Sequence, residues 1–178
     1  FQAGDLDVAE RAFQAALARD PDARAALNGL AIVQRGRGDL EGAAELLVRV
    51  TTVAPRDTIA WFNLAGVSLD LAQQRSGAPA DSFAAIAEAA FGACIDANYR
   101  TADALERRAR LRLRRHDFSA AEADAAHLAA IPGERLPAHI LHARAALGLR
   151  NPHGAIAALE PECASENAPV EALELLAA

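Results

Sequence analysis

One stretch of this sequence concentrates side chains of a type and spacing that could do chemistry. Arginines crowd residues 102–118, ADALERRARLRLRRHDF, in which Arg107, Arg110 and Arg114 follow one another at intervals of three and four residues. Residues at such intervals share one face of an α-helix. Their guanidinium groups could therefore bind carboxylates together, since arginine matches the geometry of a carboxylate with two parallel donors.

A plainer interpretation of the same arginines stays open. They could form a solvated helix face with local partners, for example Glu106 and Arg110 at positions i and i+4. Arg108 and Arg112 stand at positions where the pattern described below is normally apolar. We expect their aliphatic stems to lie along the edge of the core while their charged ends reach water.

The remaining reactive side chains form no catalytic pattern. His139 and His142 lie three apart on an expected helix, but no third ligand is evident, so we predict no metal site. Cys94 and Cys163 are far apart, and we expect Cys94 to be a small buried residue. The sequence has no glycine-rich phosphate loop, no GxSxG and no HExxH, so we predict no enzyme activity and no cofactor.

Composition narrows the classes of partner. The net charge of −6 argues against nonspecific binding of nucleic acid, although residues 100–150 form a basic island with 10 arginines and 6 acidic residues. No run of 18 apolar residues exists, so we expect no membrane span. No signal peptide is visible, which slightly favours a cytoplasmic location, but the chain starts at Phe1 without Met and we assign no location.

The elements that position these side chains come from an internal repeat. Ala9, Ala43, Ala87, Ala121 and Ala155 are spaced by 34, 44, 34 and 34 residues, and a second alanine series repeats those four intervals: Ala31, Ala65, Ala109, Ala143 and Ala177. Both series place the same ten extra residues between Ala65 and Ala87. Two series that agree on one insertion indicate a true repeat of 34 residues.

Each repeat is predicted to be a pair of helices. Trp61, Leu64, Ala65 and Ser68 fall on one helical face. Glycine–aspartate pairs at 4–5 and 38–39 are predicted to end one helix with a left-handed glycine and to cap the next with aspartate. No segment alternates apolar and polar residues, so we predict an all-helical protein of about nine to eleven helices.

These residues resemble the tetratricopeptide repeat (TPR) family. Trp61-x2-Leu64-Ala65 resembles the first half of its signature, and Ala9-x3-Phe13 followed by Pro21 resembles the second half. The resemblance implies a right-handed α-solenoid of stacked helical hairpins. The single array over 1–178 would hold a half unit at 1–23, full units at 24–57, 58–101, 102–135 and 136–169, and a half unit at 170–178.

The sequence departs from the family pattern at several positions. His116 and Arg150 replace the glycine before a second helix, and Tyr99 and Asn167 replace the closing proline. Pro161 falls inside an expected helix, which we expect it to shorten. The ten extra residues near 72–82, AQQRSGAPADS, contain a glycine and a proline and predict a longer loop.

The resemblance also implies a binding groove, because the first helix of each TPR unit lines the concave side. The positions that tend to face that groove are Asn28, Ile32, Arg35, Ile59, Phe62, Asn63, Leu69, Arg107, Arg110, Arg114, Ile140 and Arg144. We therefore predict a non-catalytic scaffold that binds a protein or peptide with acidic and apolar residues. Two alternatives remain: the TPR region of a multidomain bacterial enzyme (a sulfotransferase, glycosyltransferase or aspartyl/asparaginyl hydroxylase), and an assembly subunit.

The two half units predict exposed stacking surfaces. Phe13, Ala16 and Leu17 belong to a second helix without its first, while Leu173, Leu176 and Ala177 belong to a first helix without its second. Solenoid ends normally carry a polar cap. We therefore expect a fragment of a longer array, or ends that another chain, an adjoining domain or a second copy covers.

Overall fold

The computed structural model describes residues 3–164 and 169–177, and all regular structure in these residues is helical. This confirms the predicted fold class and, for the described residues, the expected number of helices. The ten helices are α1 (Ala3–Arg19), α2 (Arg24–Arg37), α3 (Leu40–Val53), α4 (Thr58–Gln74), α5 (Ala78–Asp96), α6 (Thr101–Arg114), α7 (Phe118–Ala129), α8 (Arg135–Gly148), α9 (Pro152–Cys163) and α10 (Val170–Ala177).

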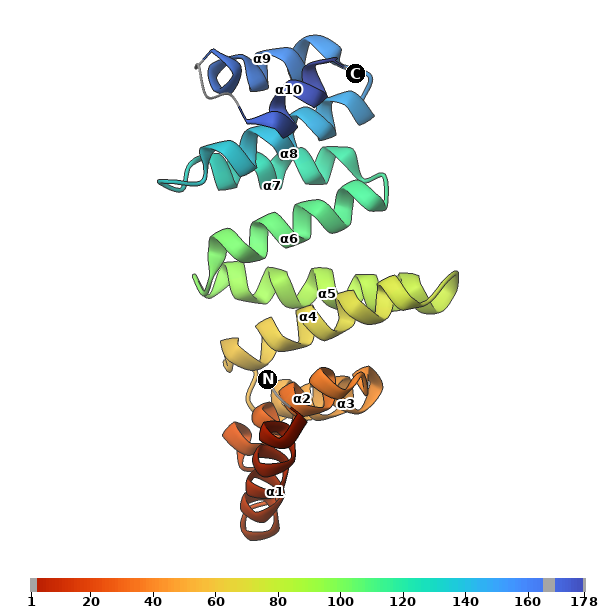
Figure 1. Cartoon of the computed structure of the whole chain (residues 1–178), viewed down its shortest axis with the longest axis vertical. Helices are drawn as coiled ribbons and strands as arrows, with labels where there is room; N and C mark the ends of the chain where they lie inside the picture. The colour runs from red at the N-terminus through yellow and green to blue at the C-terminus, as the bar shows by residue number, and fades with distance from the viewer. Residues whose placement is uncertain (1–2, 165–168, 178) are drawn as a thin grey trace. The chain divides into compact units, whose positions relative to one another are not determined.

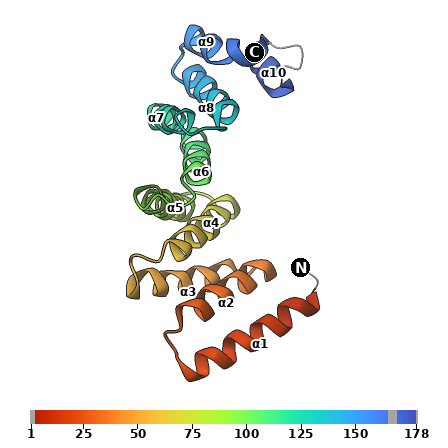
Figure 2. The ribbon, with the colours of Figure 1, turned by 90° about the vertical axis from the view of Figure 1, so that its left-hand side faces the viewer.

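The helices group into two units that are described separately (Figures 1 and 2). The first, Phe1–Tyr99, holds α1 to α5, and the second, Arg100–Ala178, holds α6 to α10. Within each unit, helices that follow one another along the chain lie side by side as hairpins, for example α4 with α5 and α6 with α7. No helix of this kind can bury its apolar face alone, so each hairpin depends on its neighbours.

The turns that lead into α3, α7 and α9 follow one design. Gly38 adopts the left-handed conformation (φ 87°), and the Asp39 side chain accepts a hydrogen bond from the backbone N–H of Gly42 at 3.0 Å. Asp117 and Asn151 cap α7 and α9 in the same way. The prediction for 38–39 is confirmed. The parallel prediction for Gly4 and Asp5 is wrong, because both residues lie inside the first turn of α1.

Two of the departures from the family pattern keep its backbone geometry. His116 and Arg150, which replace glycine, also adopt positive φ angles of 61° and 58°. A side chain in this region crowds the following carbonyl oxygen and costs roughly 1–2 kcal/mol. The hairpin turn therefore imposes the left-handed conformation even where glycine is missing.

The two alanine series form the close contacts of the core. Ala31, Ala65, Ala109 and Ala143 are fully buried on the first helices, and Ala43, Ala87, Ala121 and Ala155 are buried on the second helices. Larger residues fill the space between them, among which Leu47, Phe91 and Leu159 are fully buried. Small side chains at these positions let neighbouring backbones approach, and a larger side chain there would cost roughly 1–3 kcal/mol.

The ten extra residues extend two helices, so the prediction of a long loop is wrong. α4 continues to Gln74 and α5 begins at Ala78, which leaves three residues between them. Gly77 takes a positive φ of 64° just before α5, and Pro79 sits in its first turn. Proline is tolerated there because the first backbone N–H groups of a helix have no intrahelical partner.

α5 is long and apolar enough to cross a membrane by length and composition alone. One face of it, which includes Ala87, Ala90, Phe91 and Cys94, is buried within the first unit. Core helices of folded domains pass the same test of length and composition, so a single helix of this kind is weak evidence for a membrane span.

The last helices differ in detail from expectation. α9 continues through Pro161 and ends two residues later at Cys163. In α10, Ala172 is buried and Leu175 and Leu176 pack against α8 and α9, whereas Leu173 is 47% exposed. The repeat register predicts that Leu173, Leu176 and Ala177 lie against the preceding hairpin; this is confirmed for Leu176 and wrong for Leu173 and Ala177, which are exposed. Asn167, named above as a departure, lies outside the described residues.

Candidate functional site

Three of the predicted arginines surround one hollow in the second unit. The hollow has a volume of about 420 Å³ and is lined by Arg110, Leu113 and Arg114 of α6, Phe118 of α7 and Arg144 of α8. We call it the arginine hollow. Gly148 lets the ring of Phe118 rest on α8, because a Cβ at Gly148 would collide with that ring. The hollow thus combines guanidinium groups with an apolar floor.

Within the part of the chain that the structure describes, the arginine side chains of the hollow form only exposed ion pairs, or none. Arg110 donates to Glu106 at 2.6 Å on its own helix, and Arg144 donates to Glu171 at 2.8 Å. Both ion pairs are solvent-exposed, and such pairs contribute about 0–1 kcal/mol. Among the described residues Arg114 forms no ion pair. An incoming carboxylate could therefore replace Glu106 or Glu171 at small cost.

The other two arginines of α6 behave differently from expectation. Arg108 donates two hydrogen bonds to Asp124 of α7, at 2.7 and 3.0 Å, and Arg112 donates to the same carboxylate at 2.9 Å. The side chain of Asp124 is 4% exposed and each arginine is 17% exposed. The prediction that their charged ends reach water is wrong, since both ends point to a buried acid.

A comparison of the repeat units gives a sequence signal for this cluster. At the positions equivalent to Arg108, Arg112 and Asp124, the preceding units hold uncharged residues: Leu64, Ser68 and Ala90 in one unit, and Leu30, Gln34 and Leu46 in the other. Three uncharged positions, buried or half-buried, that become charged within one unit indicate that the charges meet one another, because charges removed from water need partners.

Several predicted groove residues of the first unit are buried or contact neighbouring side chains. Asn63 Nδ2 donates to Oδ1 of Asn28 at 3.4 Å, and Asn28 is 8% exposed. Leu69 is also 8% exposed, so it offers little surface to a ligand. Phe62 contacts the rings of Phe91 and Tyr99 edge to face, each at a centroid distance of 6.2 Å.

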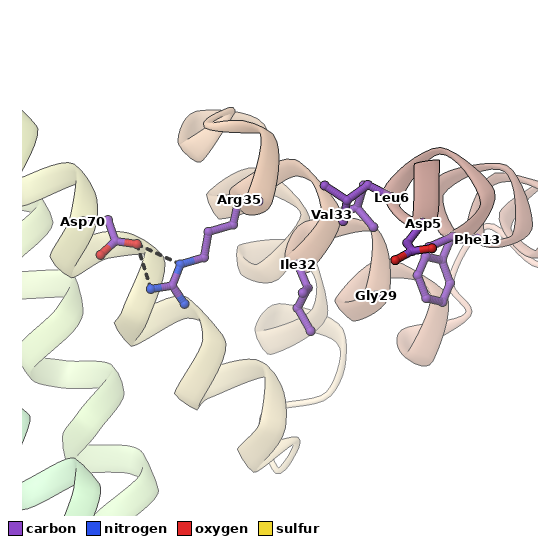
Figure 3. A pocket seen from close by; sticks show the side chains of 10 residues that line it. Asp5, Leu6, Phe13, Gly29, Ile32, Val33, Arg35 and Asp70 are labelled. Carbon is purple, nitrogen blue, oxygen red and sulfur yellow. Dashed lines mark hydrogen bonds and ion pairs between the residues drawn. The ribbon is translucent and has the colours of Figure 1, made fainter. Parts of the chain in front are cut away.

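A larger and more apolar groove lies at the start of the first unit (Figure 3). It has a volume of about 620 Å³ and is formed by α1, α2 and one residue of α4. We call it the N-terminal groove. Its lining residues are Asp5, Leu6, Ala9, Phe13, Gly29, Ile32, Val33, Arg35, Gly36 and Asp70. Two of these, Ile32 and Arg35, are among the predicted groove residues.

An ion pair between Arg35 and Asp70 forms one end of the N-terminal groove. Arg35 donates to Asp70 through Nε at 2.8 Å and approaches the same carboxylate oxygen through a terminal nitrogen at 2.7 Å, as the dashed lines in Figure 3 show. At the other end the ring of Phe13 lies against Gly29, where a Cβ would collide with it. The apolar side chains therefore dominate the open part of this groove.

His139 and His142 do not converge on a common site, and Cys94 is buried. His139 contacts Glu162 of α9 at 2.9 Å, whereas His142 contacts Glu122 of α7 at 3.3 Å, so the two rings engage different helices. The described residues contain no cluster of three or more potential metal ligands. Burial raises the pKa of the Cys94 thiol to about 11, which keeps it protonated and unreactive near neutral pH.

Arg107 is exposed on α6 but does not line the arginine hollow. Ile59 is exposed and Ile140 is buried. Arg107 and Asn63 belong to different units, so their placement on one shared wall stays a prediction. The structure thus gathers Arg110, Arg114 and Arg144 in one hollow and Ile32 with Arg35 in another.

Comparison with known proteins identifies the repeat. Residues 1–52 match the family model described as "Tetratricopeptide repeat". Residues 1–52 therefore carry a tetratricopeptide repeat. No curated protein matches it. TPR domains generally bind proteins or peptides, which supports a protein-interaction scaffold as the broad function of these repeats.

Solved structures support the TPR fold over almost the whole chain. MamA is similar at 19% identity, with a TM-score of 0.75 over 97% of this chain and 89% of that one. A tetratricopeptide repeat protein from Parabacteroides merdae has 19% identity and a TM-score of 0.77, over 98% of this chain and 65% of that one. A thermophilic TPR protein of Thermus thermophilus has 19% identity and a TM-score of 0.62, over 98% and 90%.

Proposed function

We propose that this chain is a non-catalytic scaffold that binds an acidic segment of another protein in the arginine hollow. The observation that carries the proposal is the grouping of Arg110, Arg114 and Arg144 around Leu113 and Phe118. Guanidinium groups favour carboxylates, and the leucine and phenylalanine favour an apolar side chain beside them. The expected ligand is therefore a peptide in which Asp or Glu flanks a Leu, Ile or Phe.

The location of the arginine hollow supports this choice of partner. It lies within residues 100–150, which carry 10 arginines and 6 acidic residues, in a chain whose net charge is −6. Three of those arginines line the hollow, while Arg108 and Arg112 are committed to Asp124. An acidic segment would meet a local excess of positive charge, which speeds encounter and selects against basic competitors.

Peptide selection against the whole chain tests the ligand class. A displayed library of random peptides should be enriched in sequences that place Asp or Glu next to an apolar residue. Binding of a selected peptide should weaken as salt concentration rises, because screening reduces the attraction between exposed charges. Enrichment of basic peptides, or affinity that is independent of salt, would contradict the proposal.

A charge-matched pair of variants locates the site. Arg110→Glu combined with Arg114→Glu should reduce affinity for a selected acidic peptide roughly a hundredfold, at about 1.4 kcal/mol for each lost arginine contact. Arg19→Glu combined with Arg56→Glu makes the same change in net charge at exposed positions outside the hollow and should leave affinity nearly unchanged. Equal losses of peptide affinity in both double variants would show that the effect comes from the net charge of the chain and not from the arginine hollow.

A further inference from the structure

A third hollow is formed by α3, α4 and α5, which lie in two successive hairpins of the first unit. It has a volume of about 370 Å³, and we call it the α3–α5 groove. Both α3 and α5 pack on α4, which supplies the buried floor. The apolar residues that line the groove are Ala44 and Val48 of α3, Leu64 of α4, and Phe83 and Ile86 of α5.

The apolar walls of this groove are open to solvent. Val48 is 47% exposed and Ile86 is 39% exposed. In the second unit the equivalent positions hold Ala126 and Gly154, so the repeat itself does not require large apolar side chains here. Exposed apolar side chains that gather in one hollow mark a surface that contacts a partner.

The floor of the groove holds a buried hydroxyl group. Ser68 of α4 is 1% exposed, and among the described residues its Oγ has no hydrogen-bond partner. Buried hydroxyls are nearly always paired, because an unpaired one loses its bonds to water without replacement. Since Ser68 lines the groove and can both donate and accept, a ligand with a hydroxyl of its own could pair with it.

Two glutamates make the rim of the groove acidic. Both Glu41 and Glu45 line it. Glu41 forms an exposed ion pair with Arg75, and among the described residues Glu45 forms none. Their equivalents in the second unit, Ser119 and Ala123, are uncharged. The first unit as a whole carries 13 acidic residues and 8 arginines. This charge favours a cationic partner.

We propose that the α3–α5 groove binds a basic amphipathic helix of another protein. Apolar side chains along one face of that helix would pack between Val48 and Ile86. Its lysines or arginines would meet Glu41 and Glu45, and a hydroxyl within the apolar face would pair with Ser68. The lining residues of each wall stand three or four positions apart, and such rows form the ridges on which another helix packs.

This groove differs from the arginine hollow in its charge and in the shape of its ligand. The arginine hollow takes an acidic segment, whereas the α3–α5 groove takes a helix that is already formed. Short random peptides seldom form helices, because helix nucleation is costly. Selection from a peptide library therefore reports on the arginine hollow, and the α3–α5 groove needs a helical probe. Failure of either proposal leaves the other standing.

The probe is a designed helical peptide of about 20 residues, made of alanine, lysine and an apolar stripe of leucines three and four positions apart. Circular dichroism establishes that it is helical, and fluorescence anisotropy measures its binding to the whole chain. A peptide of the same composition without the stripe should bind at least roughly tenfold less tightly. Equal binding of the two peptides would show that charge alone acts, and would overturn the proposal.

A charge-matched pair of variants tests the acidic rim. Glu41→Gln combined with Glu45→Gln keeps the size of both side chains and should weaken binding of the striped peptide roughly tenfold. Asp20→Asn combined with Asp96→Asn makes the same change in net charge at exposed positions outside the groove. This control should bind as the unmodified chain does. Equal losses in the two double variants would contradict the proposal.

A second matched pair tests the apolar walls. Val48→Ala combined with Ile86→Ala should also weaken binding roughly tenfold, because apolar contact area is lost. Val53→Ala combined with Ile59→Ala removes the same groups at positions that are 60% and 52% exposed and lie outside the groove, so it should leave binding unchanged. Loss of binding in this control to the same extent would rule the groove out as the site.

The buried hydroxyl gives the most specific test. Two striped peptides differ only at one central stripe position, which holds threonine in one and valine in the other. The unmodified chain should prefer the threonine peptide roughly fivefold, and Ser68→Ala should reverse this preference, because the threonine hydroxyl then lacks its partner. The same preference in both chains would refute the pairing with Ser68. Self-association of the chain that the two glutamine substitutions abolish would assign the groove to a second copy and overturn the proposal.

Discussion

At the scale of single residues, the cluster of Arg108, Arg112 and Asp124 is the most unusual feature of the chain. One carboxylate that is 4% exposed accepts three charged hydrogen bonds from two arginines. Removing charges from water is costly, so such a group is stable only while its members stay paired. The cluster also fastens α6 to α7, the two helices of the hairpin that carries most of the arginine hollow.

Removal of the shared acid should therefore be costly. Asp124→Ala leaves two guanidinium groups without their partner, and we expect the free energy of unfolding to fall by about 2–4 kcal/mol, somewhat below a fully buried pair because both arginines can turn toward water. Urea unfolding followed by circular dichroism measures this. Glu106→Ala breaks the exposed ion pair between Glu106 and Arg110 within α6. It should lower the free energy of unfolding by less than 1 kcal/mol.

A triple substitution separates pairing from burial. Arg108→Leu, Arg112→Leu and Asp124→Leu together remove all three charges from positions that are uncharged in the preceding units, and stability should return to within about 1–2 kcal/mol of the original chain. If the triple variant is as unstable as Asp124→Ala, burial of three charges is itself required by this hairpin, and the explanation by pairing is wrong.

At the scale of elements, the hairpin turns show what backbone geometry demands of the sequence. Gly38, His116 and Arg150 all take positive φ angles immediately before a capping Asp or Asn. Glycine adopts this conformation without a steric cost, whereas histidine and arginine adopt it only at such a cost. The capped start of the following helix stabilises the turn enough to hold the unfavourable residue in place.

Glycine at position 150 should therefore stabilise the chain. Arg150→Gly removes the strain of the left-handed conformation, and after the loss of freedom that glycine brings we expect a gain of about 0.5–1 kcal/mol. Thermal unfolding measures it. Arg150→Ala removes the same side chain but keeps the strain, so it should give no gain. Equal stabilisation by alanine and glycine would show that the arginine side chain, rather than its backbone, is unfavourable.

The elements also show how far the sequence could be interpreted without a structure. The alanine series and the pair Gly38–Asp39 predicted the hairpins and their turns, because contacts between neighbouring repeats must recur at the repeat period. The extension of α4 and α5 was missed, since a glycine and a proline that usually mark a loop instead stand at the start of a helix. Local signals fix a turn but not the length of the helix that follows.

The candidate site was predicted only in part for the same reason. The helical wheel placed Arg110 and Arg114 on one face, and the structure brings Arg144 to the same hollow. It could not show that Asn28 and Leu69 are covered, because exposure depends on side chains of neighbouring helices. The pairing of Arg108 and Arg112 with Asp124 also depends on contacts between helices, which repeat positions indicate only when units are compared.

At the scale of the whole molecule, every stabilising contact described above is local along the chain. Within each unit, each hairpin packs on its immediate neighbours, so stability is approximately a sum of contributions from single repeats and their nearest interfaces. The residues divide into two units, Phe1–Tyr99 and Arg100–Ala178. The single tryptophan, Trp61, lies in the first unit and packs against the cluster of Leu47, Leu64 and Leu71.

This arrangement predicts that a destabilising substitution in one unit lowers the stability of that unit and affects the other unit much less. In the Asp124→Ala chain, the urea midpoint measured by circular dichroism should fall and the transition should broaden, while the midpoint measured by Trp61 fluorescence should move much less. Leu47→Ala, which opens a cavity in the cluster beside Trp61 and should cost about 2–5 kcal/mol, should shift the fluorescence midpoint most. Fluorescence and circular dichroism transitions that coincide in both variants would instead show that all the repeats unfold as one cooperative body, which a solenoid with only weakly coupled repeats does not do.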